Sequence, residues 1–156
     1  MPFRIRPTTA AVAVIAIMAA GAVLAQTAAE SAIKARKAHM ALQAFNIGPL
    51  AAMAKGEADY DASAAAAAAR NLAMLTAMDV ARYYPEGTAS GEIEGTRALA
   101  AIWQTPDDFN AKWQDLGTAT AALAESAGAG LDELKSALGP VGQACGGCHK
   151  TYRVAD

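Results

Sequence analysis

The chain has 156 residues, of which 54% are hydrophobic and 18% are charged, and its formal net charge at pH 7 is −2. This length allows one domain with a buried core. The basic residues are scattered and form no basic and aromatic face, so the composition argues against a partner made of nucleic acid.

The first 25 residues are predicted to be a secretory signal peptide. Arg4 and Arg6 give a positively charged start, an apolar run covers residues 10–23, and the small residue Ala25 precedes the predicted cleavage site. A membrane anchor is the alternative, but the apolar run is shorter than the ~20 residues that cross a bilayer. We therefore expect an exported domain of residues 26–156, with no membrane span after cleavage.

Alanine dominates the mature chain, while valine, isoleucine and threonine are sparse. This composition favours helix nearly everywhere and argues against a sheet. The first predicted helix covers residues 28–55, and Gly48 and Pro49 are expected to bend it. The second covers residues 62–84 and has Asp61 as its candidate N-terminal cap.

A long connection with several glycines is expected over residues 85–104. Thr105 is the candidate cap of a third helix that should end near Gly128. The fourth helix is expected to begin around Leu131 and reach the C-terminus. Pro140 predicts a kink or a restart within it, because proline lacks the amide donor and disfavours a helical residue before it. Four amphipathic helices indicate an all-α fold, an antiparallel up-and-down four-helix bundle.

The apolar positions of the fourth helix recur every three or four residues. They are Leu131, Leu134, Leu138, Val141, Cys145, Cys148 and Tyr152. This spacing is typical of a seam that faces the other helices, and both cysteines lie on it. A group attached to these cysteines would be held in the bundle core by the C-terminal helix.

Residues 145–149 read Cys-Gly-Gly-Cys-His, and C-x-x-C-H is the attachment signature of a c-type haem. We expect one covalent haem c, with thioethers at Cys145 and Cys148 and with His149 as the proximal axial ligand of the iron. A thiol redox pair is one alternative, but it normally follows a strand in a βαβ unit, and none is predicted. Half a zinc site is the other, but a second pair of ligands is missing.

The far side of the iron is expected to face the first helix. One face of that helix carries Ile33, Arg36, Met40, Ala44, Ile47, Ala51 and Ala54. Met40 is then the natural distal residue and a candidate sixth ligand, with ordinary core packing as the alternative. The Arg36 guanidinium, one turn earlier, is a candidate contact of a haem propionate. His39 points about 100° away from Met40, so a surface imidazole is expected there.

The mature chain resembles the cytochrome c prime family, the class II c-type cytochromes. Besides the C-terminal motif, the likeness includes residues 36–40, 54–61, 84–88, 101–104 and 139–145. The resemblance implies a four-helix bundle in the periplasm, commonly a homodimer, with one covalent haem near the C-terminus. It also implies thioethers at both cysteines, His149 as the axial ligand, Met40 at the distal position and Arg36 at the propionate contact.

Members of this family differ at the distal position. In high-spin members the pocket is apolar, holds no protein ligand and binds small gases such as nitric oxide. In low-spin members a methionine of the first helix coordinates the iron, and Met40 is compatible with both. The leading hypothesis is a periplasmic electron carrier, not an enzyme, that serves unidentified redox partner proteins. A nitric oxide-binding protein is the second hypothesis, and a thiol-disulfide oxidoreductase without haem is the third.

Overall fold

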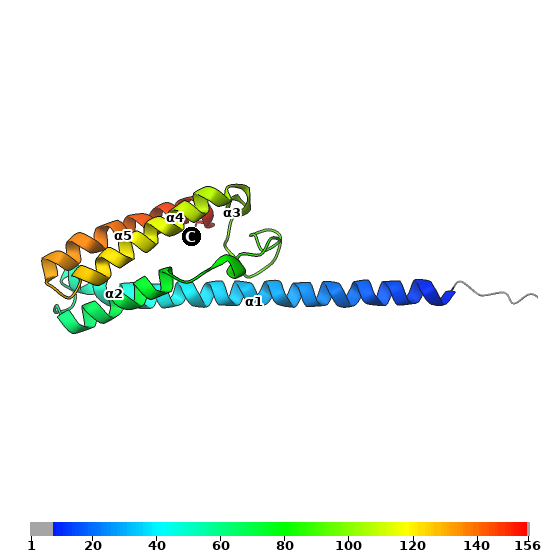
Figure 1. Cartoon of the computed structure of the whole chain (residues 1–156), viewed down its shortest axis with the longest axis horizontal. Coiled ribbons are helices and arrows are strands. Elements are labelled where there is room, and N and C mark those ends of the chain that lie inside the picture. The colour runs from blue at the N-terminus through cyan, green and yellow to red at the C-terminus, as the bar shows by residue number, and fades with distance from the viewer. Residues whose placement is uncertain (1–7, 156) are drawn as a thin grey trace, which may run out of the picture.

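The computed structural model describes residues 8–155, with side chains from residue 26 onward. Its helical segments are α1 (Thr8–Lys55), α2 (Ala62–Thr76), η1 (Ala81–Tyr83), α3 (Ala101–Gln104), α4 (Pro106–Ser126) and α5 (Leu131–Tyr152). The four long helices run alternately in opposite directions (Figure 1). α2 packs against α1 and α4, and α5 packs against α4 and α1. This arrangement is the predicted antiparallel four-helix bundle.

α1 is longer than the predicted helix, and its first half extends beyond the bundle (Figure 1). Residues 1–7 of the predicted signal peptide lie outside the described residues, and the structure describes only the backbone of residues 8–25. The cleavage site after Ala25 therefore stays a prediction. α1 continues through Pro49 as one helix that ends only at Lys55. Pro49 cannot donate to the carbonyl of Phe45, one turn earlier, and both residues are exposed, so water can satisfy this carbonyl.

α2 ends at Thr76, eight residues before its predicted end, because side chains from two other helices satisfy its last carbonyls. The indole Nε1 of Trp113 donates to the Thr76 carbonyl at 3.1 Å. The His39 ring nitrogen Nε2 lies 3.0 Å from the Leu75 carbonyl oxygen. With these acceptors occupied, the chain leaves the helix and forms the short turn η1. The start of α2 was predicted correctly, since the Asp61 carboxylate accepts from the Ala64 amide.

The start of α4 and the course of α5 at Pro140 differ from the predictions. Thr105 precedes α4 but does not cap it, because its hydroxyl contacts the Ala101 carbonyl and the Tyr152 hydroxyl instead. α5 passes through Pro140 without a restart. Pro140 is exposed, whereas Leu134 and Val141 on the opposite side are fully buried and hold both halves of α5 against the bundle.

The buried apolar side chains form two separate groups. The main core lies between the long helices and contains Leu50, Met53, Ala65, Ala68, Ala69, Leu72, Leu116, Leu123, Ala127, Leu134 and Val141. The C-terminal cluster contains Ala98, Ile102, Phe109 and Tyr152. Within the part of the chain that the structure describes, none of the helices combines the length and the apolar character needed to cross a bilayer.

Candidate haem site

The last turns of α5 lie where the two groups of apolar side chains meet. Cys145 packs against the main core, and Cys148 packs against the C-terminal cluster. Both cysteines are half-buried, as predicted for residues on the inner seam of this helix, and both are free thiols. His149 is also half-buried. The Cys-Gly-Gly-Cys-His motif therefore lies between the main core and the C-terminal cluster and contacts both.

The surroundings of the two thiols disfavour a redox role without haem. Burial raises the pKa of Cys145, and burial together with the nearby Cys145 raises the pKa of Cys148. A redox-active thiol needs the opposite shift, since the thiolate is the reactive form. A zinc site also lacks support, because the described side chains, from residue 26 to residue 155, include no group of three or more that could ligate a metal together.

Arg36 is buried on α1, and other residues hold one edge of its guanidinium. Nη2 donates to the Thr96 hydroxyl at 2.7 Å and to the Thr88 carbonyl at 3.3 Å. The guanidinium carbon lies 4.9 Å from the centre of the Tyr84 ring, within the range of a cation–π interaction. Burial lowers the pKa of Arg36 from its usual value, but arginine stays charged in proteins.

The second edge of the same guanidinium is unpartnered, because Nη1 is buried without a hydrogen-bond partner. A buried cation with a free donor favours an anionic partner, and a planar guanidinium suits a carboxylate. This arrangement is compatible with the predicted contact between Arg36 and a haem propionate.

The connection before α3 is an ordered loop that joins Arg36 to the end of α5. The Ser90 amide donates to the Ala98 carbonyl at 2.7 Å and closes the loop on itself. The Val154 amide donates to the Arg97 carbonyl at 2.8 Å and fastens the loop to the chain after α5. Thr88, whose carbonyl accepts from Arg36, is fully buried. The sequence contains no local signal for the contacts of this loop with Arg36 and Val154, because they join residues far apart in the chain.

Met40 is half-buried on α1, between the buried residues Arg36 and Gln43. Ordinary packing and contact with a haem both agree with this position. His39 is not the surface imidazole that was expected, since only 5% of it is exposed. Its ring makes edge contacts with Tyr83 and Trp113, with centroid distances of 5.6 and 5.7 Å. His39 therefore faces α2 and its neighbours.

The buried face of α1 is rotated from the face predicted by its apolar residues. It contains Ile33, Arg36, His39, Gln43, Asn46, Leu50 and Met53. Four of these side chains are polar, so a pattern of apolar residues could not identify them. Ala44, which belonged to the predicted face, is exposed.

The residues present fit a haem. Among the described residues, the buried side-chain atoms without a hydrogen-bond partner are Nη1 of Arg36 and Nε2 of Gln43, and both lie on α1 on the two sides of Met40. Buried polar groups are normally hydrogen-bonded, so two orphaned donors indicate a missing polar group at this level of the bundle. Two thiols and an imidazole at the interval between the apolar groups supply the chemistry of attachment.

Comparison with known proteins agrees with this interpretation. The profile of the family described as Cytochrome C' matches residues 31–153. A cytochrome c' of Cereibacter sphaeroides is 49% identical over 122 residues, which make up 78% of this chain and 82% of that protein. A cytochrome c-554 of Cereibacter sphaeroides is 43% identical over 124 residues, or 80% of this chain and 93% of that protein.

Solved structures give the same result. A cytochrome c' from Rhodobacter sphaeroides has a TM-score of 0.80 and 48% identity, and the match covers 82% of this chain and 98% of that one. A nitric oxide complex of a variant cytochrome c prime from Alcaligenes xylosoxidans has a TM-score of 0.71 and 32% identity, and the match covers 82% of this chain and 97% of that one. A third solved structure is described as a cytochrome c' with ligand-controlled dimer dissociation. It has a TM-score of 0.74 and 29% identity, and the match covers 81% of this chain and 97% of that one. The chain belongs to the cytochrome c' family of haem proteins.

Proposed function

We propose that the mature chain is a periplasmic mono-haem electron carrier. In this proposal Cys145 and Cys148 bind one haem through thioethers, and His149 is its axial ligand. The supporting observation is the position of this motif between the main core and the C-terminal cluster, where apolar side chains enclose it from two sides. When bound, the haem supplies a one-electron couple whose potential depends on ligands, burial and nearby charge.

The chain itself holds the group and sets its surroundings. The packed α5 fixes the two thiols and the imidazole relative to one another. Arg36 on α1 supplies a buried positive charge and a free donor, Nη1, which in this proposal neutralise the negative charge of a haem propionate. The role requires no substrate turnover, so the protein is not proposed to be an enzyme.

Met40 is the proposed distal residue and the candidate sixth ligand of the electron carrier. The test is the optical spectrum of the oxidised and dithionite-reduced haem-loaded protein, compared with that of Met40→Ala. A low-spin reduced spectrum that changes to high-spin in the variant supports ligation by Met40. A high-spin spectrum that is the same in both proteins rules out this ligation.

A gas-binding role is the second candidate, with Met40 beside the iron instead of bound to it. Its support is the half-buried Met40, which the structure does not fix by a polar contact, and the solved relative described as a nitric oxide complex. Addition of nitric oxide to the reduced protein separates the candidates. A closed low-spin carrier keeps its spectrum, whereas a protein with an open sixth position changes it.

Export is proposed from the predicted signal peptide, with cleavage after Ala25 and a mature N-terminus at Gln26. The first half of α1, which contains this site, extends beyond the bundle and is absent from the family match. N-terminal sequencing of protein from the periplasmic fraction tests the proposal. An N-terminus upstream of Ala25 contradicts it.

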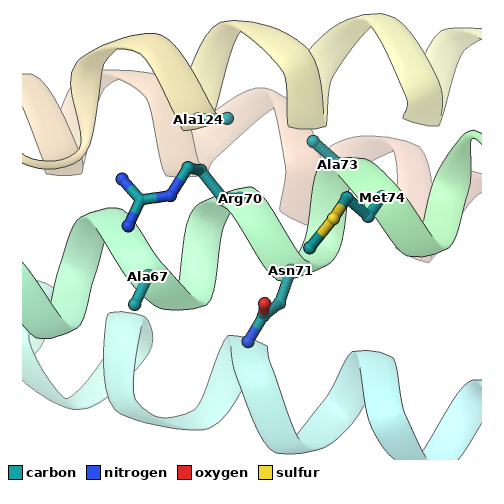
Figure 2. Close-up of a pocket in the computed structure, with 6 residues that line it drawn as sticks. All are labelled: Ala67, Arg70, Asn71, Ala73, Met74 and Ala124. Atoms are coloured by element: carbon teal, nitrogen blue, oxygen red, sulfur yellow. The ribbon is translucent and has the colours of Figure 1, made fainter.

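We also propose a homodimer that uses the exposed apolar surface of α1 and α2. Phe45 is 77% exposed and Met74 is 64% exposed, and Leu42 on α1 and Met78, just after the end of α2, are exposed as well. Met74 also lines a shallow groove on the outer side of α2, together with Arg70 and Asn71 (Figure 2). Apolar surface of this kind indicates a protein contact, and a second copy is the occupant consistent with the dimeric relative.

Sedimentation velocity tests the dimer. Phe45→Glu should convert it to a monomer, because a buried charge at the contact has no partner. Ala122→Glu, at an exposed position on α4, is the matched control and should leave the dimer intact. A wild-type protein that is monomeric at micromolar concentration contradicts the proposal.

A further inference from the structure

Gln43 is a polar residue in the interior of the bundle whose amide nitrogen lacks a partner. Only 5% of the residue is exposed, and Nε2 makes no hydrogen bond. Its buried polar neighbours on the same helix are satisfied: His39 contacts the Leu75 carbonyl, and the Asn46 side chain contacts the Leu42 carbonyl and Asn71. An unsatisfied buried donor destabilises a fold, because it has lost its hydrogen bond to water and gained none in return. Gln43 therefore indicates an acceptor that is not part of the polypeptide.

The position of Gln43 on α1 relates it to the haem site. It lies seven residues after Arg36, which is about two helical turns and returns to nearly the same face. It lies three residues after Met40, the proposed distal residue. The two orphaned donors therefore lie one turn on either side of Met40, and Ile47, one turn beyond Gln43, packs against the main core. Gln43 belongs to the inner end of the distal side.

The surroundings of Gln43 favour a small and uncharged acceptor. Among the described residues, the buried polar positions are Arg36, His39, Gln43, Asn46, Thr76, Thr88 and Thr120, with no carboxylate and no lysine. An anion at the inner end of the site would have no counter-charge there, and burial of an unpaired charge is strongly unfavourable. Arg36, in contrast, is fastened to the loop containing Thr88 and Thr96 and is the residue suited to the propionate.

We propose that Gln43 donates a hydrogen bond from Nε2 to a neutral diatomic molecule, such as nitric oxide or carbon monoxide, bound on the distal side of the haem. The proposal rests on the second candidate function, in which the sixth position is open. The distal side would then contain one hydrogen-bond donor, Nε2 of Gln43, among apolar side chains. The donor holds the distal atom of the diatomic and slows its dissociation, and it lowers the stretching frequency of bound carbon monoxide.

The test uses the full mature protein with its covalent haem, reduced with dithionite and exposed to carbon monoxide. Gln43→Leu removes the donor at similar volume, and Gln43→Ala is a second variant should leucine disturb packing. Gln114→Leu, at an exposed position on α4, is the matched control. The readouts are the infrared C–O stretching frequency and the dissociation rate measured by displacement with nitric oxide.

We expect both Gln43 variants to raise the stretching frequency and to release carbon monoxide about tenfold faster, which corresponds to a hydrogen bond of about 1.4 kcal/mol. The control should match the wild type. If carbon monoxide binds but frequency and rate are the same in all four proteins, Gln43 is not a donor, while the gas-binding function stands. If the wild type binds no carbon monoxide, the gas-binding function fails and the role of Gln43 fails with it.

Discussion

The guanidinium carbon of Arg36 lies 4.9 Å from the centre of the Tyr84 ring. Arg36 comes from α1 and Tyr84 from the start of the long loop, so this contact joins two parts of the chain that are far apart in sequence. The Tyr84 carbonyl also accepts a hydrogen bond from Trp103 Nε1 at 3.0 Å, which links the same residue to α3. Tyr84 thus fixes the aromatic side of the pocket in which Arg36 is held.

This contact leads to a prediction about alkaline stability. Burial raises the pKa of Tyr84 to about 12, although the charge of Arg36 acts in the opposite direction. In the unfolded chain the hydroxyl ionises near its ordinary pKa of about 10. The unfolded state therefore loses its proton first, and the free energy of unfolding should fall as pH rises from about 10 to about 12.

Urea unfolding between pH 9 and pH 12, followed by circular dichroism, measures this fall. Tyr84→Phe retains the ring over which Arg36 lies and removes the ionisable hydroxyl, so its stability should fall less over this range. Tyr83→Phe, which removes the hydroxyl of the neighbouring half-buried tyrosine, is the comparison variant. Identical profiles for Tyr84→Phe and the wild type contradict the prediction.

A second prediction concerns Thr96, the hydroxyl acceptor of Arg36. Thr96→Val keeps the shape of the side chain and removes the oxygen that accepts from Nη2 and from the Ala98 amide. Hydrogen bonds to charged groups contribute about 1.5–3 kcal/mol, so we expect a loss of stability of that size. Thr96→Ser should restore the wild-type value, and Thr118→Val, at an exposed position on α4, should have little effect. Urea unfolding of the haem-loaded proteins provides the comparison.

A third prediction concerns the early end of α2. Trp113→Phe keeps an aromatic ring beside His39 but removes the donor to the Thr76 carbonyl. We expect a loss of about 1 kcal/mol in global stability and faster hydrogen exchange at the Ala77 amide, which closes the last turn of the helix. Trp103→Phe loses a different hydrogen bond, to Tyr84, and should leave exchange at Ala77 unchanged. If the Ala77 amide exchanges equally fast in Trp113→Phe and Trp103→Phe, the hydrogen bond from Trp113 is not what ends α2.

A fourth prediction follows from the continuous course of α5. Pro140 lies in the interior of this helix, where proline is about 3 kcal/mol less favourable than alanine. Pro140→Ala should therefore stabilise the protein, by about 1–3 kcal/mol because the native backbone has already adjusted to the ring. Pro106, at the first turn of α4, is the control, since proline is favourable there and Pro106→Ala should not stabilise. Thermal unfolding measures both changes.

The architecture was predictable from the sequence because alanine content, helix starts and the C-terminal seam all indicate the same fold. Asp61 caps α2 as predicted, and Tyr152 on the seam is buried. The end of α2 was not predictable, since it depends on hydrogen bonds from His39 and Trp113 on other helices. Such contacts exist only after the bundle has formed.

The candidate site was predictable where local spacing determines it. Residues 145–149 form a motif that needs no long-range information, and both cysteines are half-buried on the inner seam of α5 as expected. The polar face of α1 was not predictable. Gln43 and Asn46 are buried although their side chains are polar, so a pattern of apolar residues does not identify them.

The central claim is that a haem is covalently bound through Cys145 and Cys148. Intact-mass spectrometry of protein matured with haem-attachment machinery tests it most directly, using denaturing conditions that remove any non-covalent group. We expect the mass of the chain from Gln26 plus one haem, and loss of the covalent addition when both cysteines are replaced by alanine. A wild-type mass equal to that of the unmodified polypeptide contradicts the claim.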